Sequence, residues 1–230
     1  SKMSKRDVGA AVGDYPRQGF VSAAVVNFLA LLGWSPKSED EIFTTEELIN
    51  RFSLEAVNRS PARFDPEKCA WVNQQHLLKM DAISFTEAAK PFVADAGLPV
   101  DGDYPAIAGV VQEKVRLLSE VPNAIGFLLS DDFGVEEEAL AKVRGNAAAK
   151  GLLEALAGDF DSLPEWNADA AKHQIGETAK AAGAKPGQLM FPVRVALSGK
   201  SGGPDLGDIL RLLGKDRSVA RLKSFAARLA

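Results

Sequence analysis

Residues 19–36 read GFVSAAVVNFLALLGWSP, and apolar side chains recur through this stretch at helical spacing. The apolar positions cover a wide face, so we expect a mostly buried helix over 17–32. Gly33 suits the position after a helix, and the serine–proline pair that follows blocks continuation. Ser22 and Asn27 interrupt an apolar run that is already too short to span a membrane comfortably. The stretch therefore predicts a core helix of a globular protein that has no membrane partner.

Capping signals predict further helices along the chain. Thr44 with a glutamate three residues later is a capping-box pattern, and Asp65 before a proline predicts an N-cap. Ser84 and Ser162 are each followed by a glutamate at the same spacing. The expected helices after residue 32 cover 44–52, 65–79, 84–97, 105–118, 123–129, 135–143, 146–157, 162–183, 205–213 and 216–229. Together these signals predict a mainly α fold.

The segment 187–199 leaves its structure open. Its composition suits a helix, but Pro192 lies in the middle and should break a regular one. Turn signals and shifts of charge predict three regions, 1–80, 81–160 and 161–230.

Charge is unevenly distributed along the chain. The protein has 27 Lys and Arg against 31 Asp and Glu, a net charge of -4, which by itself argues against nucleic-acid binding. The excess of acid lies in residues 81–165, however, and residues 185–230 carry nine basic against three acidic side chains. One interpretation is ordinary solvated helix faces; the other is a basic C-terminal surface that meets phosphates.

The residue inventory excludes several kinds of protein. The one cysteine, Cys69, rules out an intramolecular disulfide, and two distant histidines make a metal site improbable. We expect Cys69 and His76 on the apolar face of one helix as structural residues, and the three tryptophans in the core. Gly199-Lys200-Ser201 is not a phosphate-binding loop, because Arg194 stands where that motif needs glycine. No signal peptide is found, which predicts a cytoplasmic protein.

The first residues carry a dense basic motif, Lys2-Met3-Ser4-Lys5-Arg6. Two lysines in one loop could reach the phosphates of a nucleotide and stabilise the charge on a pyrophosphate leaving group. The motif resembles the KMSKS signature of class I aminoacyl-tRNA synthetases, with Arg6 in place of the last serine. Five stretches are similar to the part of glutamyl-tRNA synthetases that follows this loop: 19–36, 41–49, 57–73, 191–199 and 210–215.

The resemblance implies a fold and a reaction. Residues 1–80 would hold the loop and a stem-contact domain, and 81–160 and 161–230 two subdomains of an all-α anticodon-binding region of the bacterial type. The family attaches glutamate to tRNA through an adenylate made from ATP. Its Rossmann-type catalytic domain is absent from this sequence, which also begins without Met. We therefore expect a fragment without aminoacylation activity, no complete catalytic site and no metal.

The resemblance also implies residue roles. Lys5 would touch ATP, a substrate of the full enzyme, while Lys2 and Ser4 would shape the loop. Phosphate contacts need Lys and Arg, so Arg194, Lys200 and, more weakly, Arg116 are the candidates for tRNA contact. A glutamate-accepting tRNA and the missing catalytic domain are the expected partners, and the family implies a monomer.

Two other functions remain open at this stage. A stand-alone RNA-binding module could descend from such a synthetase half. A helical interaction scaffold without affinity for RNA would explain the acidic middle, but it would leave the basic loop at 2–6 and the basic C-terminal block unexplained.

Overall fold

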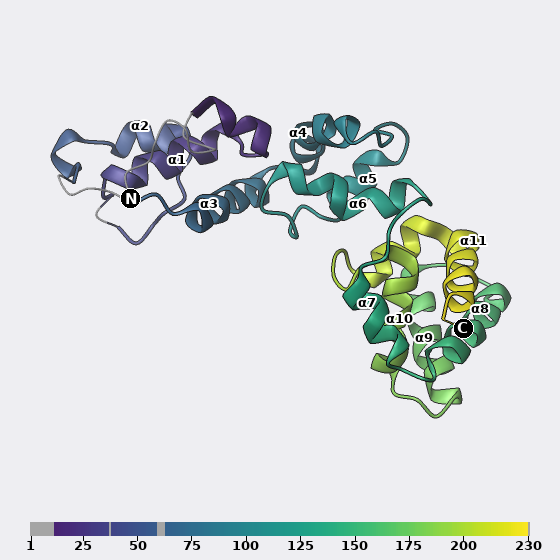
Figure 1. The fold of residues 1–230 in the computed structure, drawn as a ribbon. Coiled ribbons are helices and arrows are strands. Elements are labelled where there is room, and N and C mark those ends of the chain that lie inside the picture. The colour runs from purple at the N-terminus through teal and green to yellow at the C-terminus, as the bar shows by residue number, and fades with distance from the viewer. Residues whose placement is uncertain (1–11, 37, 59–62, 230) are drawn as a thin grey trace. The chain divides into compact units, whose positions relative to one another are not determined.

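A computed structural model describes residues 12–36, 38–58 and 63–229. The chain forms two compact units, residues 1–123 and 124–230 (Figure 1). The described residues form helices, and their one β-type pairing is an isolated bridge between Trp34 and Val57. The mainly α prediction is therefore confirmed. The predicted division into three regions stays a prediction.

Helices of up to 14 residues, short 3-10 turns and long connections make up the first unit. Its elements are η1 (Val12–Asp14), η2 (Pro16–Gln18), α1 (Ser22–Gly33), α2 (Thr45–Arg51), η3 (Leu54–Ala56), α3 (Pro66–Lys79), α4 (Ala82–Asp95), α5 (Tyr104–Gly109), η4 (Leu118–Glu120) and the start of α6 (Val121–Leu129). The expected core helix is α1, which packs against α2 and α3. One core cluster joins Phe28 of α1 to Cys69 and Val72 of α3. A second joins Trp34 to Phe43 and Leu48.

Long helices with short turns build the second unit. They are the rest of α6, then α7 (Glu137–Arg144), α8 (Ala149–Ser162), α9 (Ala168–Ala181), α10 (Pro186–Ser198) and α11 (Leu206–Ala227). Helices α8, α9, α10 and α11 pack on one another around fully buried leucine, isoleucine and phenylalanine side chains. Gly214 has a φ of 73° inside α11 and bends it, so the prediction of two helices meeting near 214 is confirmed.

Several predicted caps are also confirmed. The Thr44 hydroxyl accepts from the Glu47 amide, and the Glu47 carboxylate accepts from the Thr44 amide. Asp65 accepts from two amides of the first turn of α3. These caps depend on side chains only two or three residues away, which is why the sequence pattern predicts them.

Two predicted caps are wrong. Asp81, not Ser84, caps α4, and Ser84 instead donates its hydroxyl to Asp81. Asn167, not Ser162, caps α9, and Ser162 is the last residue of α8. In both cases a better carboxylate or amide acceptor lies at a neighbouring position that also fits the start of the helix.

The helix predicted over 105–118 is also wrong in its length. Helix α5 ends at Gly109, and turns follow as far as residue 114. Val111 and Val115 are buried in this segment, and the Gln112 amide donates to the carbonyls of Leu77 and Met80 at the end of α3. Tertiary packing has therefore overridden a local helical pattern.

The open question at 187–199 is settled as a helix. Helix α10 runs through Pro192, which cannot donate to the carbonyl of Gln188 four residues earlier. The Asn146 amide donates to that carbonyl at 3.0 Å instead. A side chain from the α7–α8 turn thus satisfies the group that the proline leaves without its helical partner.

Candidate nucleic-acid interface

The predicted ATP-binding loop Lys2-Met3-Ser4-Lys5-Arg6 lies outside the described residues. The candidate tRNA contacts Arg194 and Lys200 lie in the second unit, and Arg116 lies in the first. The site is therefore built from the loop between α10 and α11, and the surroundings of Arg116 are described separately.

Arg194 lies on α10 and bonds the C-terminal part of the 199–205 loop. Its Nη1 donates to the carbonyl of Pro204 at 2.8 Å. The side chain is half-buried, and burial lowers the pKa of its guanidinium. Arg194 is thus a structural anchor of this loop, whatever else it contacts.

Glu136 bonds the N-terminal part of the same loop. Its carboxylate accepts from both the amide and the hydroxyl of Ser201, each at 3.0 Å. These donors lower the pKa of Glu136, the Ser201 amide most strongly. The Glu136 amide in turn donates to the Gly199 carbonyl at 2.8 Å. Gly199 has a φ of 72° and lies so close to the backbone of Gly134 that a Cβ would collide with it.

A third anchor lies at the end of the loop. Asp205 caps α11 by accepting from the Gly207 amide at 2.8 Å, and it pairs with Lys172 of α9 at 2.9 Å. Between these anchors, Gly202 and Gly203 are exposed. The loop therefore presents backbone groups and Lys200 at a fixed surface, which suits recognition of the edges of unpaired bases.

Lys200 is half-buried rather than fully exposed. Its amide donates to the Ser198 hydroxyl at 3.2 Å, and its charge contributes to the lowered pKa of Glu136. The structure thus places Lys200 and Arg194 at one loop, where the Ser198 hydroxyl bonds the main chain of both. Their contact with tRNA stays a prediction.

Most other cations of the basic C-terminal block already have partners within the unit. Arg217 and Arg221 pair with Asp131, Arg211 with Asp208, and Lys223 with Asp161, and Lys215 donates to a main-chain carbonyl. Arg221 is only 8% exposed. The positive charge that the sequence assigns to this block is therefore largely used in holding helices together.

Arg116 belongs to the first unit and is also paired. Its Nη1 lies 2.9 Å from the Glu67 carboxylate, and its Nη2 donates to the Glu67 carbonyl at 2.8 Å. An open groove beside this pair is lined by Glu41, Lys68 and Trp71. Trp71 is 38% exposed, so the expectation that it lies in the core is wrong, whereas Trp34 is buried as expected.

Cys69 and His76 are structural, as the sequence predicts. Burial raises the pKa of the Cys69 thiol to about 11, so the thiolate needed for nucleophilic chemistry is disfavoured. His76 Nε2 lies 3.0 Å from Asn27 Oδ1 in the core. No cluster of three or more metal-binding side chains occurs within the described ranges.

Glu136, which fixes the 199–205 loop, is a functional candidate that the sequence did not predict. Glu136 lies in an acidic run, 65 residues before Ser201, and no local pattern distinguishes it from Glu137 or Glu138. A contact between segments this far apart depends on the fold and has no signature of its own.

The comparisons define the class of protein first. The family model described as anticodon binding domain matches residues 84–226, and the model of the class I tRNA synthetase (E and Q) catalytic domain matches residues 1–71. The chain belongs to the anticodon binding domain family.

The relatives narrow this class to one kind of enzyme. A glutamate–tRNA ligase of Akkermansia muciniphila is 50% identical over 226 residues, which cover 98% of this chain and 51% of the relative. Another of Moorella thermoacetica is 37% identical, over 96% of this chain and 47% of the relative. The crystal structure of a glutamate tRNA ligase from Elizabethkingia meningosepticum, in complex with its amino acid, superposes with a TM-score of 0.85 at 28% identity. It covers 100% of this chain and 49% of that one.

These findings confirm the resemblance to glutamyl-tRNA synthetases and do not favour the scaffold or the stand-alone module. The chain spans about half the length of the curated relatives it matches. In the part of the chain that the structure describes, no helix has both the length and the apolar character of a membrane span.

Proposed function

We propose that this chain is the tRNA-binding half of a glutamate–tRNA ligase and that it recognises the anticodon of a glutamate-accepting tRNA. The observation that carries the proposal is the pair of family matches, catalytic at 1–71 and anticodon-binding at 84–226, in a chain whose relatives are glutamate–tRNA ligases. Within this half, residues 1–80 contact the stem, and 81–160 and 161–230 form two helical subdomains at the anticodon.

The 199–205 loop is the part of the second unit best suited to recognise bases. A rigid array of donors and acceptors discriminates between bases because a wrong base leaves buried polar groups unpaired. Glu136, Arg194 and Lys172 hold this loop from three sides, through Ser201, Pro204 and Asp205. Arg194 and Lys200 supply positive charge beside it for the RNA backbone.

The rest of the reaction belongs to the full-length enzyme. There, Lys5 of the basic loop contacts ATP, with Lys2 and Ser4 shaping the loop, and glutamate is activated in a Rossmann-type domain. We propose that the present chain, which matches the catalytic-domain model at residues 1–71, does not aminoacylate tRNA alone. The full enzyme acts as a monomer in the cytoplasm.

Binding of the purified chain to a glutamate tRNA tests the proposal. We expect binding that weakens with salt and with substitution of the anticodon. In Glu136→Ala the loop loses an anchor, so preference for the correct anticodon should fall about tenfold, which corresponds to ~1.4 kcal/mol. Glu136→Gln keeps an acceptor oxygen for the Ser201 amide and should retain most of the preference.

Two outcomes would contradict the proposal. Wild-type binding that ignores the anticodon would reduce the chain to a backbone-binding surface. An unchanged preference in Glu136→Ala, with an unchanged melting temperature, would show that the hydrogen bonds to Ser201 do not position the loop for recognition of bases.

A further inference from the structure

Four cations at one end of the second unit have no ion-pair partner among the described residues. Lys142 and Arg144 lie in the last turn of α7, Lys150 in the first turn of α8, and Lys185 immediately before α10. Lys142, Arg144 and Lys185 are exposed. Four cations of the C-terminal block, Arg211, Arg217, Arg221 and Lys223, pair with carboxylates instead. The exposed cations at this end of the unit are therefore available to a polyanion.

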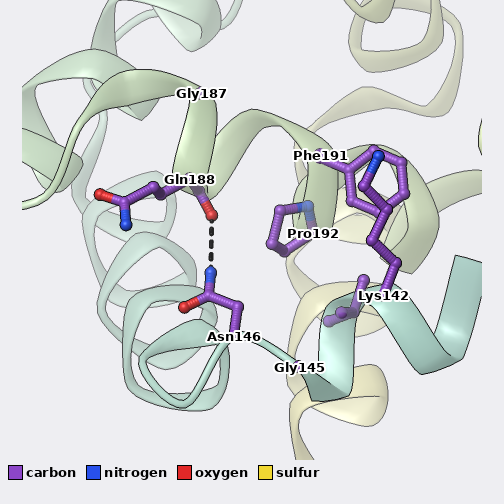
Figure 2. Close-up of a pocket in the computed structure, with 8 residues that line it drawn as sticks. Lys142, Gly145, Asn146, Gly187, Gln188, Phe191 and Pro192 are labelled. Atoms are coloured by element: carbon purple, nitrogen blue, oxygen red, sulfur yellow. Dashed lines mark hydrogen bonds between the residues drawn. The ribbon is translucent and has the colours of Figure 1, made fainter.

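Lys142 lines a groove of about 420 Å³, and Arg144 and Lys185 lie within two residues of other lining positions in the sequence. It is lined by Lys142, Val143, Gly145 and Asn146 of the α7 side and by Gly187, Gln188, Phe191 and Pro192 of α10. Figure 2 shows the Lys142 side chain lying over the Phe191 ring; its Nζ is 4.4 Å from the ring centre. The groove thus combines the aromatic face of Phe191 with the ammonium group of a long, flexible lysine side chain at its rim.

The walls of the groove are fixed before any ligand binds. The Asn146 amide donates to the Gln188 carbonyl, as Figure 2 shows, and Asn146 Oδ1 accepts from the Ala148 amide at 3.2 Å. Pro192 leaves the Gln188 carbonyl without a helical donor, which makes it available for this bond. A preformed groove binds its ligand without a cost for ordering the walls.

The chemistry of the groove fits one nucleotide of a single strand. An aromatic side chain stacks on a base of any sequence, and lysine neutralises the phosphate. No Cβ fills the space at Gly187 in the first turn of α10, so the backbone is open to close approach there. An acidic peptide would also meet the lysines, but aspartate and glutamate side chains have no aromatic ring to stack against Phe191.

The groove is separate from the 199–205 loop. Glu136 bonds Gly199 at one end of α10, and Asn146 bonds Gln188 at the other, so α7 and α10 run antiparallel. The 13 residues of α10 extend about 20 Å. The nucleotide bound in the groove is therefore a different one from the nucleotide whose base contacts the 199–205 loop.

We propose that the α7–α10 groove binds a nucleotide of the tRNA strand, with its base against Phe191 and its phosphate against Lys142 and Lys185. The proposal rests on the proposed function and adds a second RNA contact to it. On binding, Lys142 moves from the Phe191 ring to the phosphate, and the base takes its place. Because stacking is tolerant of sequence, this contact adds affinity and leaves anticodon preference to the loop.

Charge-removing variants of the whole chain test the groove. Lys142→Gln and Lys185→Gln should each weaken tRNA binding three- to tenfold and lower the slope of log K against log salt by about 0.7. Phe191→Leu should weaken binding about fivefold or more without changing the slope. Lys223→Gln, whose lysine pairs with Asp161, is the matched control and should change neither quantity.

The outcomes separate this inference from the proposed function. Suppose that the wild-type chain binds tRNA, and that Lys142→Gln and Phe191→Leu bind it as tightly as the control Lys223→Gln. The groove is then not an RNA site, and the proposed function stands. If the groove variants weaken binding while the anticodon has no influence, the groove is supported and anticodon recognition fails. If Lys142→Gln weakened binding of a fluorescent polyglutamate peptide but left tRNA binding unaffected, the inference would be overturned. Absence of any tRNA binding overturns both.

Discussion

In the first unit, buried amide side chains bond the backbone of long connections, whereas in the second a buried arginine bonds the ends of packed helices. Asn27 donates to the Glu41 carbonyl and accepts from the Phe43 amide, and Asn73 joins Val21 to Arg116. These side-chain amides provide hydrogen-bond partners for backbone groups that have no partner within a helix. The first unit therefore depends on a few specific polar residues for its irregular shape.

In the second unit, the buried side chain of Arg221 bonds backbone carbonyls at the ends of helices. Its guanidinium donates to the carbonyls of Leu197 and Phe127 at 2.6 and 2.8 Å and pairs with Asp131. Its Cζ also lies 4.5 Å from the centre of the Phe133 ring. One side chain thus ties α11 to the ends of α10 and α6. The difference shows that cations, of which Arg221 is the most buried, bond much of the backbone at helix ends in the second unit, whereas neutral amides do so in the first.

The largest effect should come from removing that cation. Arg221→Ala leaves the carbonyls of Leu197 and Phe127 without this donor, takes one of two arginines from Asp131 and opens a cavity, so we expect a loss of about 3–5 kcal/mol in unfolding free energy. Arg211→Ala is the control, because its pair with Asp208 is exposed and is worth ~1 kcal/mol or less. Urea unfolding followed by circular dichroism measures both. Equal losses would show that burial of Arg221 does not matter to the second unit.

A smaller effect should follow from breaking the amide network of the first unit. Asn27→Ala leaves the buried Phe43 amide without an acceptor and should cost about 2–3 kcal/mol. Hydrogen exchange at the Phe43 amide should accelerate, while amides of α8 stay protected. Asn50→Ala, at an exposed position of α2, is the control and should change neither. Acceleration in both units would mean that they do not unfold separately.

The smallest effect concerns pH. Burial lowers the pKa of His76, with a further contribution from Lys79, so the folded protein binds this proton less readily than the unfolded chain. Stability should therefore be complete above the unfolded pKa of about 6.5 and should fall as pH drops through it, levelling below the folded pKa.

Unfolding of the first unit in urea at pH 7.5 and 5.5 measures this dependence on His76. His76→Gln should remove much of it, since glutamine does not titrate, whereas His173→Gln, at an exposed position, should leave it in place. A pH dependence that survives in His76→Gln would assign it to other groups.

The sequence predicted much of the helical structure because its signals are local. The capping box at Thr44 and the N-cap at Asp65 need only the next few residues, and both are confirmed. The predictions at Ser84, Ser162 and 105–118 failed where a neighbouring acceptor or a buried valine outweighed the local pattern. The candidate tRNA residues Arg194 and Lys200 could be proposed from charge and resemblance, but Glu136 could not.

The sequence by itself determined the helical class of this protein and its resemblance to glutamyl-tRNA synthetases, because helix periodicity, caps and family motifs are written in neighbouring residues. Only the tertiary structure decided which cations are available to a partner. Arg217 pairs with Asp131, 86 residues away, and Lys223 with Asp161, 62 residues away. Such pairs depend on which helices pack together, whereas net charge counts paired and unpaired cations alike.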